Sequence, residues 1–250
     1  MSLVIGIAFK DFVIVSNDSK VTIQHYYADT LEKDKSKPII ETNLKSEKVT
    51  RITDKVFLAV TGFQNVTELI KQELVQRVNK DNDLQECSKI AEQVITEIKG
   101  RELEGLDIPE QDAIRMIREG FSAYLFGFTH SGNAGLKDIC YGGYAESRDI
   151  TKAYPTVING PDPEYDFKFR EVLSLRKDER FFQNFINRIL VVHAYLSHKH
   201  HTSVSTDCNF HILYKDGDLI KYSKQTIDSA NYYEQFGLKT LQKEVESDDF

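Results

Sequence analysis

Apolar residues near the start of this chain fall into short runs that are separated by charged or polar positions. The first two runs, 3–9 and 12–22, are joined by Lys10-Asp11, and this pattern predicts a β-hairpin at the beginning of the chain. The stretch that follows, roughly 29–46, is rich in charge and contains one proline. It is typical of a long loop or an extended hairpin.

A second hairpin and two helices are predicted next. Two apolar runs lie within 48–60, on either side of a polar turn. Apolar residues then recur every three or four positions over 66–78 and again over 84–98, which is the spacing of one helix face. An aspartate before the second helix, Asp81 or Asp83, is suited to cap it.

The second half of the chain repeats this order of strands, helices and strands. The predicted elements are strands at 121–129, 136–141 and 153–158, helices at 164–175 and 180–197, and a closing hairpin at 207–214 and 219–222 that precedes a short helix. Strands joined by hairpins form antiparallel sheets, and apolar helix faces pack on sheets. The order therefore predicts an α+β fold, a four-layer α-β-β-α sandwich, in one domain that spans 1–250.

Composition narrows the class of protein. The formal net charge of −7 argues against a general surface for nucleic acid or an anionic membrane, so neither is expected as a partner. Three cysteines without metal-like spacing favour reduced thiols and a cytoplasmic protein. The group His198, His200 and His201 is interpreted as a polar helix end rather than a metal site, and no metal or cofactor is expected.

Candidate chemistry begins at the second residue. Ser2 follows the initiator methionine, and small residues at this position usually permit removal of Met1. Ser2 would then carry a free hydroxyl and a free α-amine, whose pKa of roughly 7.7–8.0 suits a general base at neutral pH. Met-Ser-Leu is also a start that expression vectors add, which would make Ser2 foreign to the protein.

Ser2 stands at a defined spacing from Asp18, Lys48 and Gly62. In these residues and in the order of its elements, the chain resembles the N-terminal-nucleophile (Ntn) hydrolase superfamily, and proteasome β-type subunits in particular. The resemblance places Ser2 at the nucleophile position and Asp18 at the acidic residue that ends the second strand. It places Lys48 at the active-site lysine and Gly62 at the glycine whose N–H serves as oxyanion donor.

The resemblance implies a peptide or amide hydrolase. Ser2 Oγ would attack an amide carbonyl while its own amine takes the proton, which gives an acyl-enzyme. Lys48 would act as a fixed positive charge that is paired with Asp18. An oxyanion donor of the kind that Gly62 would supply is worth about 2.7–4 kcal/mol in other hydrolases.

The resemblance also implies the binding residues and the partners. Lys20 and Thr22 are similar to the family's basic residue and to its substrate-backbone-binding threonine. The implied partners are a peptide or amide substrate and further copies of the chain in a homo-oligomer, for which a ring is one arrangement.

Two family elements are altered in this sequence. A Gly-Ser pair expected before the third helix is replaced by Asn159-Gly160-Pro161-Asp162. The family's Asp-x-x-Ser element aligns with His200 and Ser203, or with His201 and Val204 if a gap of one is allowed. The aspartate is lost in either alignment, and Ser203 is a weaker site candidate. These departures leave two functions open: an Ntn hydrolase with Ser2 as nucleophile, or a catalytically silent proteasome-fold protein that serves assembly or binding.

Overall fold

The computed structural model covers the 250-residue chain and describes residues 3–23, 40–62, 64–101, 121–140, 145–150, 156–160, 173, 182–201 and 203–235. Ser2 lies outside the described residues, and so does the helix predicted at 164–175 apart from Leu173. Within the described part, the elements follow one another in the predicted order.

One five-stranded sheet has the order β10-β1-β2-β11-β12 and is antiparallel throughout. Its strands are β1 (Val4–Phe9), β2 (Phe12–Asn17), β10 (Thr156–Asn159), β11 (Asp207–Asp216) and β12 (Leu219–Asp228). The first hairpin turns at Lys10-Asp11 as predicted, with Phe9 opposite Phe12. The prediction of a short last strand at 219–222 is wrong in length, because β12 pairs with β11 up to Asp228.

The apolar run 12–22 does not form a single strand. β2 ends at Asn17, and the chain continues as β3 (Lys20–Ile23), which pairs with β4 (Ile40–Lys45) in a separate two-stranded sheet. The Asp18 side chain accepts the Lys20 N–H at 2.9 Å, a local bond that turns the backbone out of the first sheet. β4 lies in the stretch for which a loop or an extended hairpin was predicted, and it forms the hairpin.

The second five-stranded sheet has the order β5-β6-β7-β8-β9 and is also antiparallel. Its strands are β5 (Val49–Arg51), β6 (Val56–Gly62), β7 (Phe121–Phe128), β8 (Ala134–Asp138) and β9 (Arg148–Asp149). The predicted hairpin over 48–60 is confirmed, since Val49 faces Ala59 across β5 and β6.

Four helices are present in the described ranges: α1 (Gln64–Arg77), α2 (Leu84–Arg101), α5 (Phe182–Lys199) and α6 (Ala230–Gln235). Of the two candidate caps for α2, Asp83 is the one in place, because its Oδ1 accepts the N–H groups of Gln85 and Glu86 at 2.9 Å each. None of the helices described is long and apolar enough to cross a membrane.

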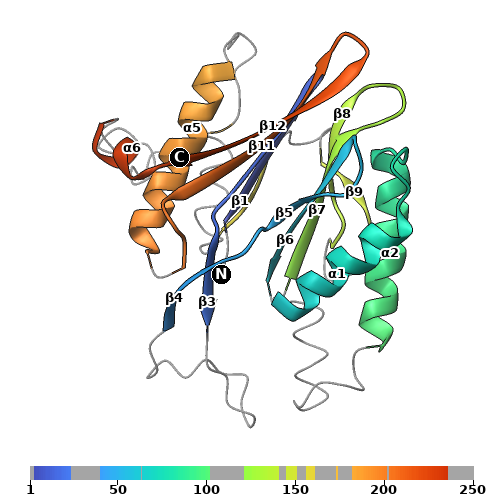
Figure 1. Cartoon of the computed structure of the whole chain (residues 1–250), viewed down its shortest axis with the longest axis horizontal. Helices are drawn as coiled ribbons and strands as arrows, with labels where there is room; N and C mark the ends of the chain where they lie inside the picture. Colours follow the sequence, from blue (N-terminus) through green and yellow to red (C-terminus); the bar gives the residue numbers. More distant parts are fainter. Residues whose placement is uncertain are drawn as a thin grey trace, which may run out of the picture.

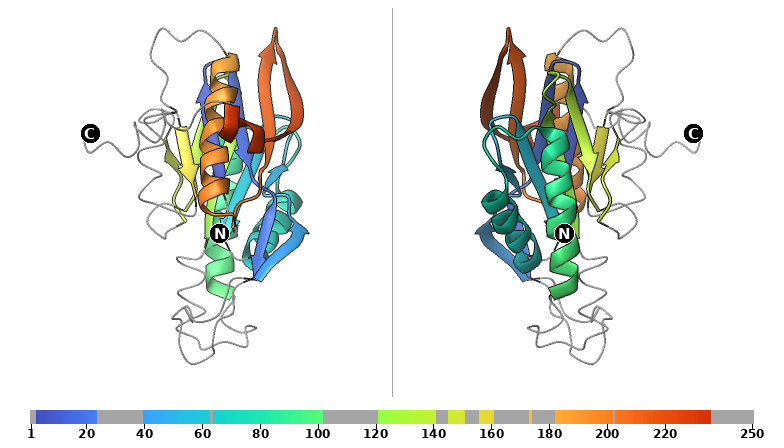
Figure 2. Two further views of the ribbon diagram at one scale, coloured as in Figure 1. Left: turned by 90° about the vertical axis from the view of Figure 1, so that its left-hand side faces the viewer. Right: turned by 90° about the vertical axis from the view of Figure 1, so that its right-hand side faces the viewer.

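Three apolar cores separate four layers. α5 packs on one face of the first sheet through a core that includes Ile5 and Leu190, and α1 and α2 pack on the second sheet through a core that includes Leu58 and Ile95. Figure 1 shows the two sheets facing each other between these helices, and Figure 2 shows α5 and α2 on opposite sides. The third core joins the sheets, so the fold is the predicted α-β-β-α sandwich.

Candidate active site

The site is centred on a buried ion pair between Asp18 and Lys48. Asp18 follows β2 and Lys48 precedes β5, so the pair connects the two sheets of the sandwich. Lys48 Nζ lies 2.5 Å from Asp18 Oδ1, and the two side chains are 7% and 0% exposed. Two residues that are 30 positions apart in the sequence are therefore brought into direct contact, in surroundings where each charge needs the other.

The same carboxylate holds the first described residue of the chain. Leu3 N–H donates to Asp18 Oδ1 at 2.7 Å, and Asp18 N–H donates to the Leu3 carbonyl at 3.3 Å. Oδ2 accepts the Lys20 N–H, so Asp18 receives three N–H donors in all: two from the backbone and one from Lys48. Such a set of donors satisfies a buried carboxylate and fixes its orientation.

Burial changes the acid–base properties of Lys48. Loss of water around the ammonium group lowers the pKa of Lys48, and the charge of Asp18 together with its hydrogen bond opposes this effect. Desolvation is the larger cause, so Lys48 loses its proton more readily than an exposed lysine does. A lysine of this kind is suited to proton transfer as well as to fixed electrostatic support.

Gly62 lies at the end of β6, on the strand next to Lys48. The Val60 N–H donates to the Lys48 carbonyl at 3.0 Å, and Gly62 is two residues farther along, about 7 Å in an extended strand. Gly62 has φ 124°, in the region that glycine adopts and other residues disfavour. This strand end is partly open, since Gly62 is an exposed residue beside the buried Thr61.

The turn after α5 lies against the junction of β2 and β3. Lys20 Nζ donates to the carbonyl of His201, and Ser19 N–H donates to Ser205 Oγ at 3.2 Å. Ser203 is 1% exposed, and its backbone N–H closes the turn by donating to the His200 carbonyl at 2.8 Å. Both His201 and Ser205 therefore contact the residues next to Asp18, and the sequence prediction, which named Ser203, missed Ser205.

Not every predicted site residue is described. Ser2 lies outside the described residues, and Thr22 is placed by its backbone on β3, opposite Glu41. Asp18 and Lys48 are in contact, whereas Gly62, Lys20 and Ser203 lie on segments that adjoin this pair.

A hollow of about 580 Å³ opens beside the segment that carries Lys48. Ser46 and Thr50, two residues to either side of Lys48, line it together with Glu68 and Lys71 of α1. Lys71 Nζ donates to Glu68 at 2.8 Å and to the Glu47 carbonyl at 2.6 Å. The hollow thus has charged and hydroxyl groups on its walls, and its volume is in the range of small-molecule sites.

One group of side chains in the described part has the spacing of metal ligands: Asp83, Glu86 and His130. Asp83 caps α2 and also accepts the His130 N–H at 2.8 Å, while Glu86 lies 3.1 Å from His130 Nε2. These bonds join α2 to the turn between β7 and β8. The three side chains therefore lie close together because they hold these two segments in contact.

Comparisons with known proteins support the fold. No family model matches the chain, and no curated protein matches its sequence. Among solved structures, an Anbu (Gly-1) mutant from Hyphomicrobium sp. strain MC1 is similar, with a TM-score of 0.64 and 11% identity over 100% of this chain and 99% of that one. At this identity the similarity is one of fold.

Proposed function

We propose that this protein is an Ntn amide or peptide hydrolase that acts through an acyl-enzyme at Ser2 once Met1 is removed. The observation that carries the proposal is the shared carboxylate of Asp18. One of its oxygens accepts both Lys48 Nζ at 2.5 Å and the N–H of Leu3 at 2.7 Å. The backbone next to Ser2 and the buried ammonium group of Lys48 therefore donate hydrogen bonds to the same oxygen, Asp18 Oδ1.

The covalent chain supports a role for Ser2. Because Ser2 is bonded to the nitrogen of Leu3, its Cα is about 3.8 Å from that of Leu3. The Leu3 nitrogen and Lys48 Nζ cannot be farther apart than their two distances to Asp18 together. On this ground the proposal places the Ser2 hydroxyl beside Lys48, as nucleophilic catalysis requires.

In this mechanism each group has one task. Ser2 Oγ attacks the carbonyl carbon, its proton passes to the α-amine directly or through water, and the amide nitrogen leaves with a proton. Lys48 stabilises the developing negative charge near Ser2, and Asp18 holds Lys48 in position. Gly62 N–H donates to the oxyanion, and water then hydrolyses the ester.

The substrate in this proposal is an extended peptide that lies between β3 and the end of β6. Lys20 and Thr22 bind its backbone, and the hollow beside Lys48 accepts one side chain. The proposed setting is the cytoplasm, on the ground that Cys87, Cys140 and Cys208 are all free.

Self-association is a separate part of the proposal and rests on the similarity in fold. We propose that the protein forms a homo-oligomer, and light scattering tests this directly. A mass equal to that of the 28.8 kDa chain at all concentrations would refute it.

The decisive experiment joins intact-mass measurement to active-site labelling. We expect the natively expressed protein to lack Met1 and to gain the mass of an acyl-directed inhibitor on the peptide that begins with Ser2. Ser2→Ala abolishes labelling and peptide turnover, whereas the matched control Ser223→Ala, on the exposed strand β12, leaves both unchanged. Retention of Met1, or full turnover by Ser2→Ala, refutes the hydrolase and points back to a silent protein of this fold.

A further inference from the structure

The inner face of the second sheet changes from apolar to polar where β7 begins. Along this strand, Tyr124 and Phe126 belong to the core between the sheets, whereas Ala123 and Leu125 face α1 and α2. Because side chains alternate along a strand, Ser122 faces the first sheet as Tyr124 does. Ser122 is half-buried, and among the residues that the structure describes its hydroxyl has no hydrogen-bond partner.

Contacts across this core relate positions on β7 to positions on β1. A Cβ on Gly6 would lie 2.0 Å from the ring of Phe126, so the backbone of β1 rests on that ring. Asn159 is paired with Val4, and its Nδ2 donates to the Tyr124 hydroxyl at 3.1 Å. One step of two residues toward the start of β1 thus corresponds to one step of two residues toward the start of β7.

The next step of this kind leads from Tyr124 to Ser122 and from Val4 to Ser2. In the proposed hydrolase, Ser2 would extend β1 by one inward-facing position and lie across from Ser122. Packed sheets are about 10 Å apart, and two short serine side chains fill only part of that distance. The remaining space between Ser2 and Ser122 is where the carbonyl that Ser2 attacks would lie.

The pairing of β6 with β7 also brings Ser122 next to Gly62. Thr61 lies directly opposite Ser122, and Gly62 lies directly opposite Phe121. Directly opposite residues have Cβ atoms about 4.5–5.5 Å apart, so the Ser122 hydroxyl is close to the strand end that carries the Gly62 N–H. Thr61 is 6% exposed, so Ser122 is the more accessible hydroxyl of the pair. Oxyanion holes combine backbone N–H groups with side-chain donors of this kind.

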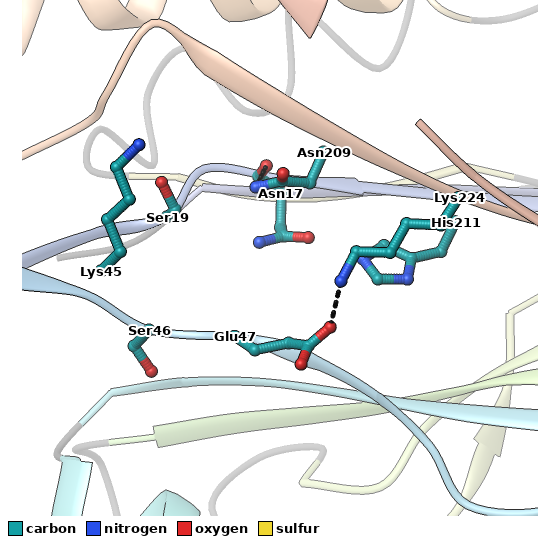
Figure 3. Close-up of a pocket in the computed structure, with 8 residues that line it drawn as sticks. All are labelled: Asn17, Ser19, Lys45, Ser46, Glu47, Asn209, His211 and Lys224. Carbon is teal, nitrogen blue, oxygen red and sulfur yellow. Dashed lines mark hydrogen bonds and ion pairs between the residues drawn. The ribbon is translucent and has the colours of Figure 1, made fainter. Parts of the chain in front are cut away.

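Side chains on the other side of Lys48 are less suited to this task. Figure 3 shows Asn17 and Glu47 on facing walls of a cavity of about 200 Å³ beside β12. The Nδ2 of Asn17 already donates to the Asp18 carbonyl at 2.7 Å, and Glu47 carries a negative charge that repels an oxyanion. Ser122 lies on β7, two strands away from β5, which follows Glu47.

We propose that Ser122 is a second oxyanion donor and thus a catalytic residue, an inference that rests on the proposed hydrolase because it needs Ser2 as nucleophile. As Ser2 Oγ bonds to the carbonyl carbon, an electron pair of the C=O bond moves to the oxygen, and the Ser2 proton passes to the α-amine. The oxyanion accepts the Gly62 N–H and the Ser122 O–H. The C=O bond then re-forms, and the amide nitrogen leaves with the proton from the α-amine.

The variant Ser122→Ala measures this contribution to turnover. Loss of one oxyanion donor lowers kcat by about 10²–10³-fold in other hydrolases, and we expect a fall of about this size with little change in KM. Ser122→Thr keeps a hydroxyl and is expected to retain most of the activity. The matched control Thr61→Val removes the buried hydroxyl directly opposite, and it too is expected to retain most of the activity.

Binding of a peptide aldehyde separates oxyanion stabilisation from a structural effect. Its adduct with Ser2 is tetrahedral and carries an oxygen at the oxyanion position, so we expect Ser122→Ala to weaken aldehyde binding by the same factor as it lowers kcat/KM. The variant is expected to keep the thermal stability of the parent protein, because the Ser122 hydroxyl makes no hydrogen bond within the described residues.

The outcomes distinguish the role of Ser122 from the hydrolase itself. Full kcat in Ser122→Ala, or a fall in kcat with unchanged aldehyde binding, overturns the role of Ser122 while an active parent protein upholds the hydrolase. An equal loss in Thr61→Val also overturns it, since the effect would then not belong to Ser122. A parent protein with neither turnover nor an adduct at Ser2 refutes the hydrolase, and the role of Ser122 is refuted with it.

Discussion

Replacement of Asp18 by Asn measures how far the candidate site depends on its buried charge. The substitution keeps the size of the side chain but removes the negative charge that faces Lys48 at 2.5 Å. In the parent protein, three N–H donors share the two oxygens of Asp18. The asparagine side chain would offer these donors a single oxygen. Lys48, at 7% exposure, has little access to water that could replace the lost charge.

The expected loss is large for a conservative change. Breaking one partner of a buried ion pair costs about 3–5 kcal/mol, against at most about 1 kcal/mol for a pair on the surface. Part of this loss is avoided if Lys48 gives up its proton, which its burial already favours. We therefore expect Asp18→Asn to lower the free energy of unfolding by about 3 kcal/mol at neutral pH.

Urea unfolding provides the measurement. The chain has 12 tyrosines and no tryptophan, so tyrosine fluorescence and far-UV circular dichroism report on the transition. Asp54→Asn serves as the matched control, because Asp54 makes an exposed ion pair with Arg51 at 3.0 Å. If Asp18→Asn costs no more than Asp54→Asn, the Asp18–Lys48 pair is solvated in solution and the argument for a desolvated site fails.

Three other expectations follow from single contacts. Burial lowers the pKa of His193 to about 4, below the unfolded value of 6.5, so stability that is present above pH 6.5 is lost as the pH falls toward 4. We expect urea titrations to show a loss of about 3 kcal/mol over this range, and His193→Gln to show a shallower pH dependence. Gly6→Ala would place a Cβ 2.0 Å from Phe126 between the sheets, and we expect a thermal-unfolding loss of about 1–3 kcal/mol or more. Asp83→Ala removes the acceptor of three backbone N–H groups, and a loss of about 2 kcal/mol in the same assay is expected, whereas Asp83→Asn retains part of it.

Local patterns in the sequence predict most of the fold correctly. The Lys10-Asp11 turn, the hairpin within 48–60 and the apolar faces of α1 and α2 all follow from periodicity and turn residues, and each is present in the structure. These features depend on residues close in sequence, where propensity and burial act together. The four-layer arrangement then follows, because strands such as β1 and β6 bury both faces whereas each covering helix buries one.

Features that depend on contacts between distant segments could not be predicted from those local patterns. The end of β2 at Asn17 is set by what the Asp18 side chain binds, and an apolar run does not reveal that. The length of β12 is decided by its pairing with β11, since most of its residues are exposed and lack strong alternation. Ser205 was missed for a similar reason: its contact with Ser19 spans 186 positions and no local motif marks it.

The double variant Asp18→Asn/Lys48→Met decides whether the buried pair serves stability or chemistry. Apolar replacement of a buried ion pair is often neutral or stabilising, because the desolvation of both charges is avoided. In this protein, the new amide in place of Asp18 would still offer one oxygen to the N–H of Leu3 or Lys20, and the methionine side chain would fill the volume of the lysine stem. We expect the double variant to regain at least half of the stability lost in Asp18→Asn and to have no hydrolase activity. A double variant as unstable as the sum of both single variants would show that the pair is needed by the fold itself, and its position beside Leu3 would no longer favour a catalytic role.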